Sequence, residues 1–252
     1  MKRYRHVYSL TLADIDPDKR MTAGAVLCYF QDTIARFLAE NRVGAFDLME
    51  EAGITWMITE FHSELGRLPT WPGITQVEVF LSELSSVKVY VDYRMRDERG
   101  NIFARGSSTW LMVDVTTRRM LPHQSIPRFA GLMYDEQNHI AHRRYSFPAP
   151  DLEAGSTDAV DAAETVHTVS ASETDFNGHM SNRDYVRLAM SLLQPLAPAD
   201  LSIRALHVKF LQECHKGEKL LCLCGRDRGR LTAVLLGTAR HPVCQLVTEW
   251  QT

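Results

Sequence analysis

The order of apolar and polar residues along the chain predicts a strand, a long helix and then four strands. In the first half, apolar residues alternate over residues 7–12 and recur at helical spacing from residue 21 to about residue 41. A shorter helix is expected at residues 45–51. The four later strands of this half are expected at residues 54–64, 74–84, 87–96 and 101–115.

The second half repeats this order. A strand is expected at residues 164–171, a loop at 172–179 and a helix at 180–193. Four further strands are expected at residues 203–213, 218–225, 231–238 and 243–250. The same succession of elements in both halves indicates a duplicated α+β unit.

Individual residues support the duplication. Asp16 and Met21 recur as Asp175 and Met180, 159 positions later. Further correspondences are expected between Phe61 and Phe210, Glu64 and Glu213 (both at an offset of 149), and Trp110 and Trp250 (at 140). The offset only decreases along the chain, which is expected if the first copy has longer loops.

The segment from residue 134 to about residue 162 is polar and contains prolines, which indicates a linker. We therefore predict a first domain at residues 1–135, a linker at 136–162 and a second domain at 163–252. A long helix followed by antiparallel strands, present twice, resembles a tandem (double) hotdog fold, in which a curved sheet wraps each helix. Fusing two copies makes an internal pseudo-dimer sufficient, and a further homodimer is left open.

Candidate chemistry precedes the second long helix. Asp175, Asn177 and His179 alternate, so an extended backbone would place their three side chains on one side. The N-terminus of a helix offers unpaired N–H groups that can stabilise a carbonyl oxygen as it becomes negative. The alternative is that Asp175 and Asn177 are turn or capping residues and that His179 is an ordinary loop residue.

The first copy has Asp16, Asp18 and Arg20 at these positions. A guanidinium cannot exchange protons near neutral pH, whereas an imidazole can. The difference favours one functional site per chain, in the second copy, with the first copy catalytically degenerate.

A second ionisable cluster ends the strand at residues 203–213. Glu213 could orient His179 or a water molecule, and Cys214 could be a nucleophile activated by His179. Alternatively, Glu213 pairs with Lys216 and Cys214 is a small thiol at a strand edge. Because adjacent strand residues point to opposite faces, the pattern favours activated water over a cysteine nucleophile.

Composition narrows the possible functions. The 252 residues carry a formal net charge of −3, which gives no support for nucleic-acid binding, and no segment is apolar enough for a signal peptide or a membrane span. Five cysteines are too few for a disulfide scaffold and indicate reduced thiols in the cytoplasm. Cys222 and Cys224 alternate as in a strand, so neither a metal nor another cofactor is expected.

The string Asp175-x-Asn177-x-His179-Met180-Ser181-Asn182, followed 34 positions after His179 by Glu213-Cys214, resembles the acyl-acyl carrier protein thioesterases of plant plastids and bacteria. The resemblance extends over nearly the whole chain. It implies a double hotdog enzyme whose catalytic positions are Asp175, Asn177, His179, Glu213 and Cys214. The chain differs from the plant form in having no transit peptide, which suggests a bacterial cytoplasmic enzyme, and in having Ser181 where asparagine is common.

The resemblance also implies hydrolysis of fatty acyl-acyl carrier protein, which ends fatty acid synthesis. The acyl chain is expected to lie in an apolar tunnel of the first copy, lined by Val26, Tyr29, Phe30, Trp56 and Met57. The acidic carrier protein is the expected partner, and basic clusters could dock it. The candidate clusters are Arg226 with Arg228 and Arg230, Arg118 with Arg119 and Arg128, and Arg143 with Arg144.

Three alternatives remain at this point: an acyl-CoA thioesterase, a hotdog hydratase or dehydratase, and an acyl-thioester sensor without catalytic activity.

Overall fold

The computed structural model describes residues 3–133, 145–147, 160–197, 201–227, 230–237 and 240–251. The chain divides into two compact units, Met1–His142 and Arg143–Thr252. Most of the linker predicted at residues 136–162 lies outside the described residues, as do Arg143, Arg144 and Arg228 of the predicted basic clusters. Within the described part of the chain, no helix is long and apolar enough to cross a membrane.

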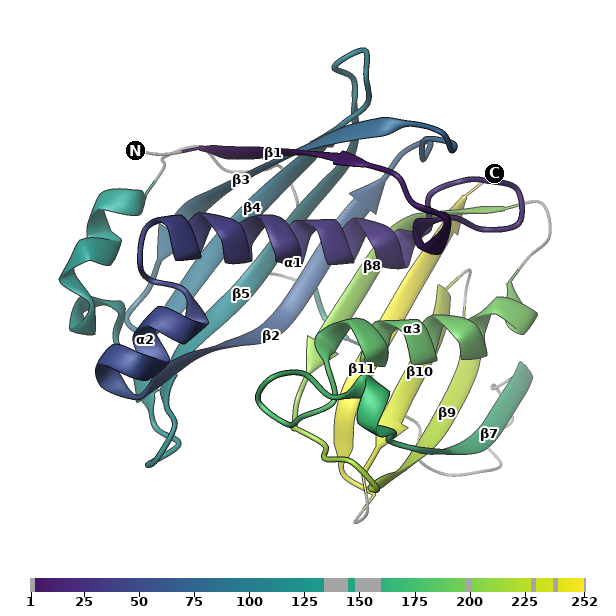
Figure 1. Ribbon diagram of the computed structural model, residues 1–252. Coiled ribbons are helices and arrows are strands. Elements are labelled where there is room, and N and C mark those ends of the chain that lie inside the picture. Colours follow the sequence, from purple (N-terminus) through teal and green to yellow (C-terminus); the bar gives the residue numbers. More distant parts are fainter. Residues whose placement is uncertain are drawn as a thin grey trace. The chain divides into compact units, whose positions relative to one another are not determined.

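In the first unit a long helix, α1 (Ala23–Glu40), lies across an antiparallel sheet (Figure 1). The sheet has the strand order β1-β3-β4-β5-β2, and β6 pairs with β5. Its strands are β1 (Tyr4–Ser9), β2 (Ile54–Leu65), β3 (Ile74–Leu84), β4 (Lys88–Arg96), β5 (Ile102–Asp114) and β6 (Met120–Leu121). The shorter helices are η1 (Leu12–Asp14), α2 (Ala45–Ala52), η2 (His123–Ser125) and η3 (Pro127–Leu132).

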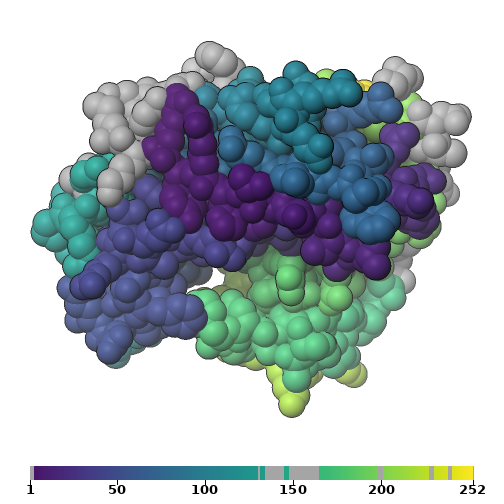
Figure 2. All heavy atoms as spheres, turned by 45° about the horizontal axis from the view of Figure 1, so that its top comes forward, coloured from purple at the N-terminus to yellow at the C-terminus, as the bar shows by residue number. Residues whose placement is uncertain are grey.

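The apolar face of α1 forms the core of this unit. Val26, Phe30 and Ile34 are fully buried along the helix. Phe30 stacks on Tyr93 of β4, with ring centroids 4.7 Å apart. Gly106 of β5 makes room for this stack, because a Cβ there would lie 2.7 Å from the Phe30 ring. In the space-filling view, β1 (purple) lies at the surface beside the indigo helices of this unit (Figure 2).

In the second unit α3 (Asn182–Leu193) lies across a sheet of strand order β8-β11-β10-β9-β7 (Figure 1). The strands are β7 (Val160–Thr168), β8 (Ser202–Phe210), β9 (Lys219–Asp227), β10 (Arg230–Leu236) and β11 (Pro242–Gln251). Two short 3-10 helices, η5 (Ala171–Glu173) and η6 (Gln194–Leu196), flank α3. The helix packs its buried residues Tyr185, Val186, Ala189 and Leu193 towards the core.

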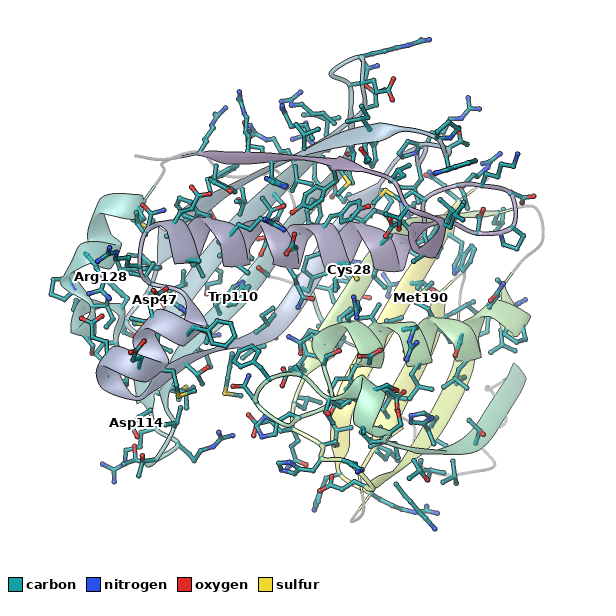
Figure 3. All side chains as sticks on the ribbon, viewed as in Figure 1. Cys28, Asp47, Trp110, Asp114, Arg128 and Met190 are labelled. Atoms are coloured by element: carbon teal, nitrogen blue, oxygen red, sulfur yellow. The ribbon has the colours of Figure 1, made fainter. Side chains whose placement is uncertain are left out.

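The two units repeat in detail. Trp110 of β5 (Figure 3) lies opposite Ile58, and Trp250 of β11 lies opposite Ile203, each beside a β-bulge. Each indole N–H donates to a hydroxyl two residues earlier in the chain: to Ser108 at 2.6 Å and to Thr248 at 2.9 Å. The predicted correspondence of Trp110 with Trp250 therefore agrees with the strand pairing.

The same strand pairing corrects another correspondence. Since Ile58 matches Ile203, β2 and β8 are related by an offset of 145, so the counterpart of Phe61 is Leu206 and that of Glu64 is Lys209. The predicted matches to Phe210 and Glu213 were wrong by four residues. Both units carry the bulge at the same place, so the offset of 145 holds on either side of it, and the pairing with β5 and β11 fixes this register.

Some predicted strand ends also differ. β1 and β7 end earlier than predicted because capping boxes, Thr11 with Asp14 and Ser170 with Glu173, start short 3-10 turns there. β8 ends at Phe210 rather than at residue 213, so Glu213 and Cys214 lie in irregular backbone beyond the strand. The two residues are therefore not constrained by regular strand geometry.

Candidate active site

A tight turn precedes α3. Thr174 and Met180 form an antiparallel bridge, and within it the Asp175 N–H donates to the His179 carbonyl at 2.8 Å. The Asp175 carboxylate accepts from the Asn177 N–H, also at 2.8 Å. Gly178 has a φ of 78°, which closes the turn at a conformation that glycine adopts without steric cost.

This turn corrects the expectation of an extended backbone. Alternation does not place Asp175, Asn177 and His179 on one side, because the chain reverses direction between Asp175 and His179. Asp175 is exposed and its carboxylate holds the turn, while Asn177 is half-exposed. The contact of its carboxylate with the Asn177 N–H agrees with a turn role for Asp175, one of the alternatives at the level of sequence.

His179 meets Glu213. The Nδ1 atom of His179 lies 3.5 Å from Oε1 of Glu213, and both side chains remain partly accessible, at 21% and 27%. An N–H···O link joins the two segments nearby, from the Met180 N–H to the Cys214 carbonyl at 2.7 Å. Residues 34 positions apart are thus brought together next to the start of α3.

His215 also contacts His179, and the sequence analysis did not select it as a site residue. The two rings lie edge to face, with centroids 4.7 Å apart and an interplanar angle of 75°. Their backbones form an antiparallel bridge. The only available signal was that His215 follows the Glu213-Cys214 pair, and this gave no indication of the bridge.

Cys214 lies apart from His179 and Glu213. It is 1% exposed, and its thiol lies beside the buried Tyr185, whose hydroxyl donates to the Gln212 carbonyl at 3.4 Å. Burial raises the pKa of the Cys214 thiol, and the nearby Glu218 carboxylate raises it further despite the Tyr185 contact. A thiol in this setting stays protonated at neutral pH and is a poor nucleophile.

The N-terminus of α3 adjoins the turn. Ser181 is the N-cap, and its side-chain oxygen accepts from the Asp184 N–H at 3.1 Å. The Ser181 hydroxyl in turn donates to the Asp184 carboxylate at 2.5 Å. The helix therefore starts directly after His179 and directs the partial positive charge of its N-terminus to this part of the molecule.

A residue with a buried carboxylate, Glu173, holds the chain next to the turn. Glu173 is 5% exposed, and its backbone carbonyl accepts from the Ser181 N–H at 2.8 Å. Its side chain contacts His167 at 3.0 Å and accepts from the Ser170 hydroxyl at 2.8 Å. Burial alone would raise the pKa of Glu173, but the Ser170 hydrogen bonds and His167 outweigh it and lower that pKa.

The first unit has the same turn without the same chemistry. Its Asp16 N–H donates to the Arg20 carbonyl at 2.8 Å, and Arg20 forms a bridge with Thr70. By this pairing Arg20 stands where the second unit has His179, and Thr70 stands where it has His215. The residue two before Thr70 is Leu68, so the counterpart of Glu213 is apolar. Only the second unit combines an imidazole with a carboxylate here.

The residues predicted to line an acyl tunnel have different surroundings. Val26 and Phe30 are fully buried in the core, and Met57 is half-buried. The Tyr29 hydroxyl donates to Asp14 at 2.6 Å, and its ring stacks on Tyr8. The Trp56 indole donates to the Val43 carbonyl at 2.8 Å. These residues belong to one unit, but their role in substrate binding remains a prediction.

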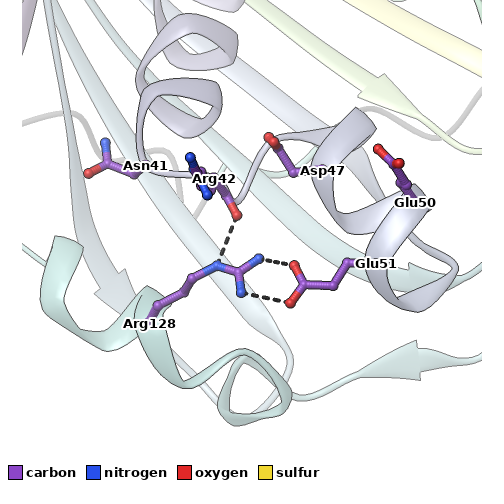
Figure 4. Close-up of a pocket in the computed structure, with 6 residues that line it drawn as sticks. All are labelled: Asn41, Arg42, Asp47, Glu50, Glu51 and Arg128. Carbon is purple, nitrogen blue, oxygen red and sulfur yellow. Dashed lines mark hydrogen bonds and ion pairs between the residues drawn. The ribbon is translucent and has the colours of Figure 1, made fainter.

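A surface pocket lies at the C-terminal end of α1 (Figure 4). Arg128 of η3 donates to the Arg42 carbonyl at 2.9 Å and pairs with both carboxylate oxygens of Glu51. The remaining lining residues are Asn41, Asp47 and Glu50. Because polar and charged groups line it, this pocket does not suit an acyl chain.

The basic clusters are only partly available for docking. Arg128 is engaged by Glu51, Arg226 donates to the Leu196 carbonyl, and Arg230 donates to Glu249 at 3.1 Å. Arg118 and Arg119 are exposed in the turn between β5 and β6. Apart from Cys214, the cysteines are Cys28 on α1 (Figure 3), which is half-buried, and Cys222, Cys224 and Cys244, which are buried.

Two units that each lay one long helix across an antiparallel sheet define a tandem hotdog protein. The fold resembles that of an acyl-ACP thioesterase from Bacteroides thetaiotaomicron, with a TM-score of 0.81 and 18% identity over 99% of this chain and 98% of that one. It also resembles the 12:0-ACP thioesterase from Umbellularia californica, with a TM-score of 0.85 and 18% identity over 99% and 97% of the two chains.

The sequence comparisons agree with this fold. The model of the acyl-ACP thioesterase N-terminal domain matches residues 1–125. The chloroplastic palmitoyl-acyl carrier protein thioesterase of Arabidopsis thaliana is 20% identical over 259 residues, which cover 98% of this chain and 60% of the plant protein. Together these matches support the assignment of the chain to the acyl-ACP thioesterase family. The chain spans 51–62% of the length of the curated plant relatives compared with it.

Proposed function

We propose that this protein hydrolyses the thioester of fatty acyl-acyl carrier protein and releases a free fatty acid, which ends fatty acid synthesis. The observation that carries this proposal is the pairing of His179 with Glu213 at the N-terminus of α3. Family membership supplies the reaction class, and the names of the relatives supply the acyl carrier as the candidate substrate. A cytoplasmic location is part of the proposal and rests on the five free thiols.

The proposed reaction uses activated water. Glu213 orients His179, and the imidazole takes a proton from a water molecule as that water attacks the thioester carbonyl. Backbone N–H groups at the start of α3 stabilise the negative oxygen that develops. The carbon–sulfur bond then breaks, and the proton held by His179 passes to the leaving thiolate. Asn177 is proposed to orient the substrate, and Asp175 to hold the turn.

Cys214 is not needed in this scheme. Its burial, its contact with Tyr185 and its raised pKa favour direct attack by water over a covalent acyl intermediate. Glu213 points to His179 whereas Cys214 points into the core, which is possible because β8 has already ended.

The first experiment measures release of free thiol from acyl-acyl carrier protein. His179→Ala and Glu213→Gln are expected to lower kcat by ~10²-fold or more, the usual scale for a positioned base and its partner. Cys214→Ala is expected to retain a substantial fraction of activity and serves as the matched control. An inactive Cys214→Ala, together with an acyl group trapped on Cys214 by mass spectrometry, would contradict the water mechanism.

The same assay separates the alternatives for the whole protein. Loss or gain of a double bond would indicate a hydratase or dehydratase. Binding of acyl thioester without turnover would indicate a sensor, and equal turnover of carrier-bound and CoA-bound acyl groups would indicate a general acyl thioesterase.

A further inference from the structure

The ring of His215 is placed against His179 by the backbone. The two residues are partners in an isolated antiparallel bridge, so their side chains emerge on the same face. The rings meet edge to face with centroids 4.7 Å apart. The His215 carbonyl accepts from the Glu218 N–H at 3.1 Å, which fixes the backbone on the far side of the bridge.

The first unit shows that this bridge does not require an imidazole. There the same bridge joins Arg20 to Thr70, and the adjoining hydrogen bond runs from the Met21 N–H to the Pro69 carbonyl at 2.8 Å. A threonine therefore suffices to hold the segment. A histidine replaces this threonine only in the unit that also has His179.

We propose that His215 is a positioning residue that holds the imidazole of His179 in the orientation needed for hydrolysis. The inference rests on the proposed function. The χ2 torsion of a histidine has only a broad intrinsic preference. Contacts from other residues are therefore needed to hold the imidazole in one orientation. Glu213 supplies one contact, on Nδ1 at 3.5 Å. His215 supplies the second, against the ring itself.

With both contacts in place, Nδ1 of His179 faces Glu213 and Nε2 is left for the water. The partner of one ring nitrogen fixes the tautomer of the other. Without His215, the His179 ring has one contact fewer and samples orientations in which Nε2 no longer faces the substrate. The His215 side chain need not exchange a proton for this role, which separates it from a general acid.

The test compares two replacements of His215. His215→Thr introduces the residue that the first unit has at the same bridge, and His215→Phe keeps a ring that cannot carry a proton. Thr70→Val, at the corresponding bridge of the first unit, is the matched control. Each variant is assayed with a short soluble acyl thioester, and its melting temperature is recorded.

We expect His215→Thr to lower kcat by about 10-fold, the scale of a lost positioning contact, with KM changed by less than about twofold and an unchanged melting temperature. His215→Phe should recover most of the lost kcat, and Thr70→Val should match the wild type. Wild-type kcat in His215→Thr would overturn the proposal. Equal losses in His215→Thr and His215→Phe would overturn it in favour of a proton-transfer role.

A spectroscopic measurement does not depend on turnover. The ¹⁵N shifts of the His179 ring, assigned by their loss in His179→Gln, should report a single tautomer with the proton on Nδ1 in the wild type and a mixture in His215→Thr. Identical spectra would overturn the inference. If the wild-type protein hydrolyses no acyl thioester, the proposed function fails, and this measurement still decides whether His215 positions His179.

Discussion

At the scale of single residues, the adjacent residues Glu213 and Cys214 have different surroundings. Glu213 contacts His179, whereas Cys214 is buried against Tyr185. The irregular backbone after Phe210 allows this divergence, because no ladder of strand hydrogen bonds constrains either residue. A chemical role for Cys214 therefore cannot be inferred from its proximity in sequence to Glu213.

Gly178 and Lys19 form a matched pair for a stability test. They hold the same place in the two turns, with φ values of 78° and 61°. A side chain in this left-handed conformation costs roughly 1–2 kcal/mol, and only glycine avoids that cost. Gly178→Lys should lower the free energy of unfolding by about 1 kcal/mol, and Lys19→Gly should raise it slightly. Denaturant unfolding measures both.

Equal and unchanged stability in the two variants would show that the turns tolerate a side chain at this position without strain. Because Gly178 lies one residue before His179, kcat is measured in the same preparations. A loss of kcat in Gly178→Lys beyond the small fraction unfolded would show that the turn geometry also positions the imidazole.

At the scale of elements, the Glu173 cluster connects η5 to α3 and to β7. Glu173 accepts from Ser170, pairs with His167 and lies 3.6 Å from Arg187, which also pairs with Asp184. In the first unit Asp14 takes the place of Glu173, and its carboxylate accepts hydrogen bonds from Thr11 and from the Tyr29 hydroxyl. The position is therefore used in both copies to hold the start of the long helix.

The lowered pKa of Glu173 predicts how stability depends on pH. A carboxyl whose pKa is lower in the folded state stabilises the fold above its unfolded value, here 4.5, and this contribution is lost as the pH falls through the folded value. The melting temperature of the wild type should therefore exceed that of Glu173→Gln near pH 6. The difference should shrink as the pH falls below 4.5.

Glu64→Gln, which removes an exposed carboxylate of β2, is the control and should show little difference from the wild type across this range. A gap between the wild type and Glu173→Gln that stays constant with pH would mean that Glu173 contributes by packing rather than by its charge.

At the scale of the whole molecule, the two units divide the proposed tasks. The imidazole–carboxylate pair belongs to the second unit, and the large buried aromatic residues Phe30, Phe61 and Tyr93 belong to the first. In this proposal, the duplication frees the first unit from catalysis. An apolar acyl chain is proposed to take up part of its core.

Phe30 is the residue proposed to limit acyl length. Phe30→Leu removes the ring that stacks on Tyr93 and fills the space above Gly106. The preferred substrate should shift to longer chains, since each additional buried CH₂ contributes about 0.8 kcal/mol. Product analysis with a panel of carrier-bound acyl chains measures the shift.

Phe37→Leu removes an equally buried ring further along α1 and is the control for lost stability. If both variants lose stability and neither changes the product profile, the acyl chain lies elsewhere.

Carrier docking is tested by charge reversal at Arg118 and Arg119, which are exposed in one turn of the first unit. The double change to glutamate should raise KM for carrier-bound substrate at low salt and leave KM for a short soluble thioester unchanged, because attraction between charged surfaces is screened by salt. Arg99→Glu, in the turn between β4 and β5, is the matched control. A rise in KM for both substrates would argue against docking.

The sequence by itself determined the elements and their duplication. Helical and strand periodicity arises from contacts within one element, so α1, α3 and most strands could be predicted from local pattern. The choice of His179 also came from the sequence, because the first copy lacks an imidazole where the second has one, and the choice of Glu213 came from the ionisable cluster at a predicted strand end and from the family resemblance. Local pattern was sufficient where the determining interactions are local.

Only the tertiary structure decided which side chains meet. The pairing that aligns β2 with β8, through the strands that carry Trp110 and Trp250, cannot be read from the periodicity of either strand, and it changed the counterparts of Phe61 and Glu64. The turn that reverses the chain before α3 includes a hydrogen bond from the Asn177 N–H to the Asp175 carboxylate. The contacts of His179 with Glu213 and His215 depend on a bridge between segments more than 30 residues apart. Neither segment by itself predicts this bridge, because it forms only when the folded backbone brings the two segments together.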